Sequence, residues 1–209
     1  RNGYAIISVM KTPAALKSKS GLVVLLAVAC AVMPACQATT EAQPWIWSEP
    51  AFAGIPDPVK LSELSGLTRS NSHNGVFWAI NDGSNPAEII AINAKAEPLA
   101  AVSIASTSNI DWEDITSYSV DGRKLLAIAD TGDNGGIRSE LFIHILEEPD
   151  NMQAQAIKPL RSLRFVWKDG ARDTEALFAS GTNRQFYLIS KKRVPAELYA
   201  LPFDAEDGS

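Results

Sequence analysis

Acidic residues recur in three short segments of the chain, each of which opens a run of apolar residues. The segments begin at Glu63, Asp111 and Asp173, and Glu113 and Glu175 follow two residues after the last two of these. Carboxylate oxygens are the ligands that Ca²⁺ prefers, and carboxylates held close together repel one another until a cation relieves the repulsion. The pattern predicts a calcium site, and three further acids are candidate ligands: Asp82, Asp130 and Asp133.

The same acids could also serve in catalysis. In a metal-dependent hydrolase a cation polarises the substrate and activates water, and Glu113 or Glu175 would be the general base. Arg172 and Lys191 are candidate ligands for an anionic or phosphorylated substrate. A structural interpretation stays open as well, because acids at strand starts often accept backbone N–H bonds and fix turns.

Nucleophilic hydrolysis by a serine is not expected. The sequence contains no Gly-x-Ser-x-Gly motif, the usual mark of an exposed nucleophile at a strand-to-helix turn. Its two histidines are His73, in a polar turn, and His144, which alternates within an apolar run. We interpret His144 as a packed histidine and predict no Ser–His–Asp triad in this segment.

The elements that carry the acids are predicted to be short strands. Runs of four to seven apolar and β-branched residues lie between turn signals such as Asn74-Gly75 and Asp121-Gly122. Three segments repeat the same order of elements: an acid-led strand, an apolar strand ending in a polar residue, a loop, and a third strand beginning near a glutamate. A fourth strand fits at 100–104 and 162–167. Repeats of this kind predict an all-β β-propeller with about three four-stranded blades between 61 and 204 and no helix there.

Strand polarity predicts where the acids lie. Consecutive strands of a blade are antiparallel, so the start of the first strand lies beside the end of the second. We therefore expect one rim near the inner edge of the blades to collect Glu63, Asp82, Asp111, Glu113, Asp130, Asp173 and Glu175.

The motifs resemble those of extracytoplasmic bacterial β-propellers of the phytase-like and esterase-like group, which is related to gluconolactonase-like and NHL propellers. The resemblance implies a ring of about six to eight blades, of which this chain supplies about three, so we expect it to be a fragment of a longer protein. It indicates a fold more than a chemistry, because such folds host many functions. It covers about residues 61–204 and rests on the segments 63–67, 77–86, 111–115, 129–134 and 173–177.

The N-terminal part has the pattern of a lipoprotein signal peptide. Lysines at 11, 17 and 19 precede an apolar run at 22–33, which is too short to span a bilayer comfortably. The run ends in Ala35-Cys36, which resembles a lipobox, so Cys36 is the predicted lipid attachment site. Cleavage nearby by an ordinary signal peptidase and an uncleaved anchor are the alternatives. The predicted organisation is a leader at 1–36, a tether at 37–60 and a partial propeller at 61–209.

Composition narrows the classes of function. The chain of 209 residues has a formal net charge of -5, which argues against binding to nucleic acid through its phosphates. Two cysteines exclude cysteine-rich zinc folds and disulfide-stapled miniproteins. We expect an exported, lipid-anchored binding or scaffold module with a small molecule or an envelope component as its partner and Ca²⁺ on one rim. The alternative is a metal-dependent hydrolase of the phosphatase, lactonase or esterase kind.

Overall fold

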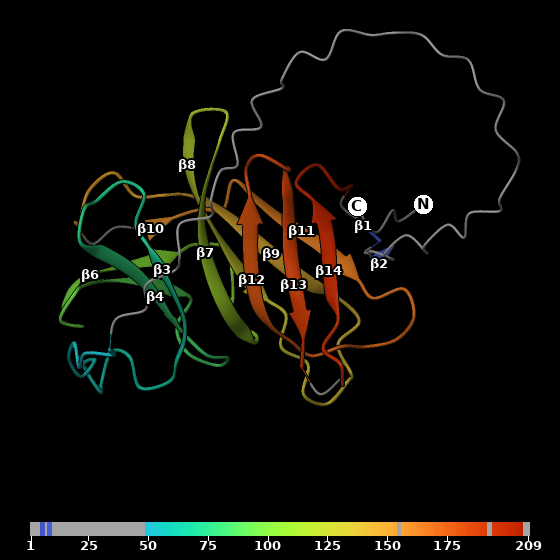
Figure 1. Ribbon diagram of the computed structural model, residues 1–209, viewed down its shortest axis with the longest axis horizontal. Coiled ribbons are helices and arrows are strands. Elements are labelled where there is room, and N and C mark those ends of the chain that lie inside the picture. Colours follow the sequence, from blue (N-terminus) through green and yellow to red (C-terminus); the bar gives the residue numbers. More distant parts are fainter. Residues whose placement is uncertain (1–4, 7, 10–48, 154–155, 192–193, 207–209) are drawn as a thin grey trace, which may run out of the picture. The chain divides into compact units, whose positions relative to one another are not determined.

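The computed structural model describes residues 5–6, 8–9, 49–153, 156–191 and 194–206, and this part of the chain contains strands but no helix (Figure 1). No helix capable of crossing a membrane is found among these residues. One compact unit comprises 1–10 together with 53–209, and the other comprises 11–52. The first unit contains every described strand, and its longer segment begins at residue 53, within the predicted tether at 37–60. Cys36 and most of the predicted leader lie outside the described residues, although residues 5–6 and 8–9 of that leader form two short strands.

Three antiparallel sheets follow one another along the chain, and each adds its main strands in sequence order. Two of them gain a short fifth strand that is parallel to its neighbour, and the third gains a short fourth strand that is antiparallel to its neighbour. The first sheet contains β3 (Leu64–Arg69), β4 (Val76–Asn81), β5 (Glu88–Asn93), β6 (Pro98–Ile104) and the short β10 (Ala156–Ile157).

The second and third sheets repeat this meander. The second contains β7 (Trp112–Val120), β8 (Arg123–Asp130), β9 (Leu141–Glu147), β11 (Arg161–Val166) and the short β1 (Ala5–Ile6). The third contains β12 (Thr174–Ser180), β13 (Gln185–Ser190), β14 (Leu198–Pro202) and the short β2 (Ser8–Val9). The all-β class and the predicted strands are confirmed, and no sheet closes on itself.

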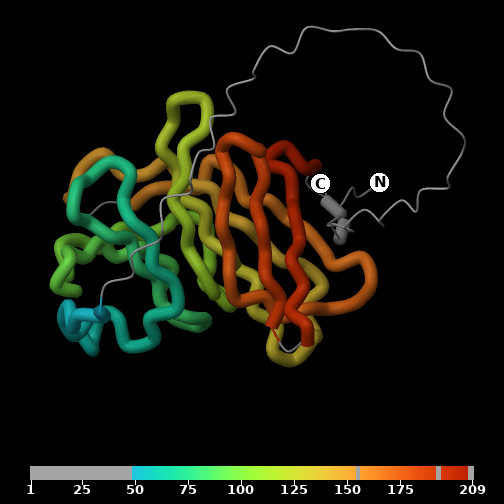
Figure 2. The backbone as a smooth tube through the Cα atoms, in the orientation of Figure 1, coloured from blue at the N-terminus to red at the C-terminus, as the bar shows by residue number. Residues whose placement is uncertain are grey.

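Turn chemistry explains why the strands fold back where they do. β7 and β8 are joined by Asp121-Gly122, whose φ angles are 51° and 75°. Two successive positive φ angles give a tight hairpin whose twist matches that of the strands, and Asp-Gly is among the pairs that adopt them most readily. The backbone trace in Figure 2 shows this hairpin as a narrow yellow-green loop.

The first strands of the three sheets lie next to one another. Between β3 and β7, the Ser65 hydroxyl donates to the carbonyl of Glu113 at 2.6 Å, and the amide of Ser117 donates to Thr68 Oγ1 at 3.0 Å. Between β7 and β12, the amide of Leu177 donates to a carboxylate oxygen of Asp114 at 2.7 Å. Polar links therefore join each first strand to the next, although the strands belong to different sheets.

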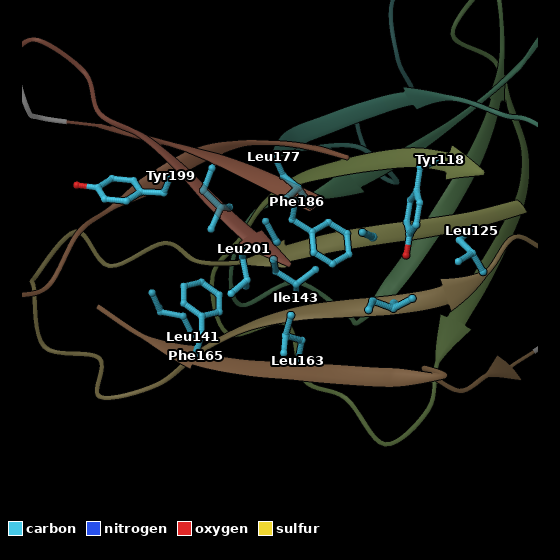
Figure 3. Packing of buried hydrophobic residues seen from close by; sticks show 14 residues of the cluster. Tyr118, Leu125, Leu141, Ile143, Leu163, Phe165, Leu177, Phe186, Tyr199 and Leu201 are labelled. Carbon is cyan, nitrogen blue, oxygen red and sulfur yellow. The ribbon is translucent and has the colours of Figure 1, made fainter. Parts of the chain in front are cut away.

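Two apolar cores fill the space between successive sheets. Trp78, Ile80, Trp112 and Ile128 belong to a core shared by the first and second sheets. A second core, between the second and third sheets, contains Tyr118, Leu141, Phe165, Phe186 and Tyr199 (Figure 3). The sheets are thus held face to face by large side chains, and the acids are left at the strand ends.

Candidate metal centre

A β-bulge occurs at the same place in all three first strands. The pairing register shifts between Leu64 and Gly66, between Trp112 and Asp114, and between Thr174 and Ala176. The extra residue in each strand is therefore Ser65, Glu113 or Glu175. A bulge re-aims the side chain of its extra residue and often lies beside a functional site. Two of the predicted acids thus project from a feature that the three repeats share.

Five of the predicted acids lie close together, with Glu113 at the centre. One close group consists of Asp82, Asp111 and Glu113, and a second of Glu113, Asp173 and Glu175. In each group one oxygen per residue lies within 4.8 Å of the others. Two oxygens that bind one Ca²⁺ at about 2.4 Å can be at most about 4.8 Å apart. Both groups therefore have the spacing of a shared cation site.

The acids of these groups come from all three sheets. Asp82 directly follows β4 of the first sheet, and Asp111 directly precedes β7 of the second, which carries Glu113. Asp173 directly precedes β12 of the third sheet, which carries Glu175. The structure thus brings together two first-strand starts, at Asp111 and Asp173, and one second-strand end, at Asp82, as strand polarity predicts.

An open pocket of about 350 Å³ lies over the carboxylates. Its lining includes Glu63, Ser65, Asp82, Glu113 and Glu175. Glu63 is outside both close groups, and its carboxylate accepts a hydrogen bond from Asn85 Nδ2 at 2.7 Å. Glu63 thus contributes to the pocket wall, and a small ligand could reach Glu113 from solvent.

Electrostatic repulsion is concentrated on Glu113. Glu113 is only 7% exposed. Burial, together with the charges of Glu175 and Asp111, raises the pKa of its carboxyl group to about 8. Burial and the nearby charge of Asp82 also raise the pKa of Asp111. A cation between these carboxylates would favour their ionised forms and remove the cause of the repulsion.

A glycine allows the loop after β8 to approach the carboxylates. A Cβ atom at Gly132 would lie 2.3 Å from Asp111 Oδ2 and 2.3 Å from Glu113 Oε1, so both carboxylates would have to move to make room for it. The Gly132 amide also donates to the Asp111 carbonyl at 3.1 Å. The loop therefore forms a wall against the first group, and the absence of a side chain at Gly132 leaves the two carboxylates in their places.

The second group already has a positive partner. Lys191 Nζ lies 2.5 Å from Glu175 Oε1 and 4.0 Å from Asp173 Oδ2. The anion-binding role predicted for Lys191 does not fit these contacts, because its ammonium faces carboxylates. The first group, Asp82, Asp111 and Glu113, is consequently the better candidate for a metal ion.

Arg172 also has a different role from the predicted one. Its guanidinium donates to Asp169 at 2.7 and 2.9 Å and to Glu197 at 3.0 Å, and it lies over the rings of Trp167 and Tyr199. Arg172 as a whole is only 5% exposed. Arg172 thus ties the β11–β12 connection to β14 and is not placed to bind an anion.

Asp130 and Asp133 belong to neither close group. Asp130 Oδ1 pairs with Arg138 Nη1 at 2.8 Å and accepts the amide of Asp111 at 3.1 Å. Asp133 accepts the amides of Ile137 and Arg138 at 2.8 and 3.2 Å. These two acids follow the structural interpretation, in which carboxylates hold a turn in place.

Sequence reasoning missed the residues that shape the site without bearing its charge. Gly132 matters through the absence of a side chain, and Arg138 pairs with an acid that had been assigned to the metal. The alignment of Ser65 with Glu113 and Glu175 was visible in the repeats, but it did not reveal a bulge, because a bulge depends on the register of the partner strand.

Comparison with known proteins adds no family to this description. No family model matches the chain, and no curated protein matches it. Antiparallel sheets alone are compatible with many functions. The residues of the site are therefore the basis on which a function can be inferred.

Proposed function

We propose that the protein is an exported calcium-binding β-propeller that acts as a binding or scaffold module at the cell envelope. The observation that carries the proposal is the convergence of acids from three sheets on the buried Glu113. A cation bound by Asp82, Asp111 and Glu113 would join the end of β4 in the first sheet to the start of β7 in the second and stiffen the rim. The rim would then present a defined surface to a partner.

The propeller part of the proposal is supported by the repeated architecture. Each sheet is a meander whose strands follow chain order, and the first strands of neighbouring sheets lie side by side. The bulge recurs at one position in every first strand. This arrangement agrees with consecutive blades of the phytase-like and esterase-like group that the motifs resemble.

The choice of calcium follows from the donor set. The first group offers only carboxylate oxygens, and hard cations prefer oxygen ligands. Magnesium is a smaller ion that demands near-octahedral coordination and keeps several of its waters, whereas calcium accepts irregular sets of six to eight oxygens. A bulged strand and two loop acids form an irregular set, which favours calcium.

Calorimetric titration of the purified chain with calcium chloride tests the metal site. We expect binding in the wild type and an affinity at least about tenfold lower in Asp111→Asn, because a charged ligand is lost. Glu147→Gln is the matched control, since Glu147 is an exposed acid paired with Arg123 away from the cluster. Absence of binding in the wild type, or equal affinity in Asp111→Asn, contradicts the proposal.

Export and anchoring rest on the leader pattern and on Cys36. Metabolic labelling with a palmitate analogue compares the wild type with Cys36→Ser in a bacterial host. We expect the label to be lost in the variant, because the predicted lipid is attached to that thiol. Equal labelling of both proteins removes Cys36 as the anchor.

A metal-dependent hydrolase is the second candidate, and the raised pKa of Glu113 beside an open pocket favours it. Glu113 would be a metal ligand, so Glu175 would be the base, although its carboxylate is paired with Lys191. Assays of phosphate monoesters, lactones and carboxylic esters, with calcium and with chelator, test this candidate. Turnover that needs calcium and is lost in Glu175→Gln supports the hydrolase, and calcium binding without turnover supports the scaffold.

A further inference from the structure

A carboxylate, an imidazole and a hydroxyl form a row across three strands of the second sheet. His144 Nδ1 lies 2.8 Å from Ser162 Oγ, and His144 Nε2 lies 3.6 Å from Asp130 Oδ2. Ser162 on β11 is the direct cross-strand partner of His144 on β9, and Asp130 ends the next strand, β8. The order of groups is that of a serine nucleophile, its base and the acid that orients the base.

The two oxygens of Asp130 have different surroundings. Oδ1 is held by Arg138 and by the amide of Asp111. Oδ2 faces His144 Nε2, and neither of these two buried atoms has another hydrogen-bond partner in the described part of the chain. Hydrogen bonds of catalytic groups are often long before substrate binds. The carboxylate is therefore fixed by one oxygen and directed at the imidazole by the other.

An open pocket of about 270 Å³ adjoins the row. Asp130, His144 and Ser162 line it together with a connecting loop between the first and second sheets. Ser162 is half-buried, so a small molecule in the pocket can reach its hydroxyl. The remaining lining residues combine hydroxyls with apolar groups: Ser106, Thr107, Ser108, Ile110 and Phe142.

We propose that Ser162 is a nucleophile that hydrolyses carboxylic esters with short acyl chains. His144 is its general base, and Asp130 is a positioning residue. The pocket's volume limits the acyl group, and Ile110 and Phe142 offer it apolar contacts. Thr107 Oγ1, which is buried and has no partner among the described residues, is the group available to donate to the developing oxyanion. This activity needs no metal ion and is separate from the function proposed for the acid cluster.

The reaction proceeds in two balanced steps. Ser162 Oγ bonds to the carbonyl carbon while its proton passes to His144 Nδ1, and the tetrahedral intermediate then collapses. The bond to the alkoxide breaks, and the alkoxide leaves as an alcohol with the proton from His144. Water, deprotonated by His144, next attacks the acyl-serine, which releases the carboxylic acid and restores the Ser162 hydroxyl.

The sequence did not predict this constellation, and the structure shows why. The expected motif was a glycine-flanked serine at a strand-to-helix turn, whereas Ser162 lies within a strand of an all-β protein. The pair depends on the register between β9 and β11, which places Ser162 opposite His144. No spacing within the sequence reveals that register.

A fluorophosphonate probe tests the proposal on the full chain. An activated serine displaces fluoride from phosphorus and retains the phosphonyl group, and peptide mass spectrometry then identifies the modified residue. We expect modification at Ser162 in the wild type and none in Ser162→Ala. Ser117→Ala is the matched control, because Ser117 is also a half-buried strand serine bonded to a side chain and should leave the labelling unchanged.

A second variant separates chemistry from folding. His144→Gln keeps a polar side chain between Ser162 and Asp130 but lacks a base, so the labelling rate should fall about 100-fold. Hydrolysis of p-nitrophenyl acetate should fall with it, in the presence of chelator as well as of calcium. An unlabelled Ser162 in the wild type, or a fall of less than tenfold in His144→Gln, overturns the proposal. Thermal melts of each variant confirm that it is folded.

Discussion

Glu113 is the residue on which the acid cluster depends, because it belongs to both close groups and lies in a bulge. Its side chain is surrounded by other acids, and its pKa of about 8 leaves it largely protonated near neutral pH in the absence of metal. A proton and a cation therefore compete for the same oxygens. The competition links calcium binding to pH and makes the state of Glu113 measurable.

The affinity for calcium should rise with pH, because the cation must displace the proton of Glu113. With one such proton, the affinity at about pH 8.5 should exceed that at about pH 6.5 by roughly 20-fold. Calorimetric titrations at both values measure it. Glu113→Gln should bind more weakly with little dependence on pH, and an affinity of the wild type that is constant across the range would contradict the competition.

The stability of the metal-free protein should show the opposite trend. The pKa of Glu113 is raised on folding from 4.5 to about 8, so its contribution is fully favourable below the unfolded value and is lost as pH rises through the folded one. In chelator, Glu113→Gln should therefore be more stable than the wild type by as much as about 5 kcal/mol at about pH 9, and the gain should disappear near pH 4.5. Urea unfolding at several pH values measures the difference in stability between the two proteins. A difference that is the same at every pH would contradict the prediction.

Gly132 should be as important to the metal site as its ligands are. In Gly132→Ala the new methyl group would overlap carboxylate oxygens of Asp111 and Glu113, and the carboxylates must move. Calcium affinity should fall by at least about tenfold, since a charged ligand is displaced. Gly135→Ala is the control, because a Cβ there meets only ordinary contacts at 3.6 Å or more. Equal calcium binding by both variants would show that the loop does not shape the site.

At the scale of the elements, the sequence predicted strands better than it predicted contacts between them. The strands predicted at 100–104 and 162–167 coincide closely with β6 (Pro98–Ile104) and β11 (Arg161–Val166), because apolar runs between turn signals depend on local sequence. The convergence of Asp82, Asp111 and Asp173 was also accessible, since it follows from strand polarity. The separation of Asp130 from these acids could not be predicted from the sequence, because it depends on Arg138, which lies in the loop between β8 and β9.

The Arg138–Asp130 pair should contribute more to stability than an exposed pair does. Arg138 is 12% exposed and also donates to the carbonyl of Gly132, so Arg138→Ala leaves a buried carboxylate without its partner. We expect a loss of roughly 3 kcal/mol in the free energy of unfolding. Arg123→Ala, which breaks an exposed pair with Glu147, should cost less than about 1 kcal/mol. Chemical denaturation distinguishes them, and similar losses would mean that Asp130 finds another partner.

At the scale of the whole molecule, the acid cluster is where the three sheets meet without an apolar core. The cores lie between the faces of successive sheets, whereas the carboxylates gather at strand ends and repel one another. The fold therefore holds its sheets together by apolar packing and separates them electrostatically at one rim. A cation bound by Asp82, Asp111 and Glu113 would convert the repulsive point into an attachment between the first and second sheets.

Calcium should accordingly protect the first and second sheets together. Asp82 follows β4 and Glu113 lies in β7, so the ion would restrain strands of two sheets, whereas Glu175 in β12 is already paired with Lys191. A ligand that binds only the folded state stabilises it by mass action, and local openings that break the site become rarer to the same degree. Hydrogen exchange measured by mass spectrometry, with calcium and with chelator, should show slower exchange in β3–β4 and β7–β8 when calcium is present. Protection confined to the second sheet would place the ion on β7 alone and would leave the sheets joined by their apolar cores only.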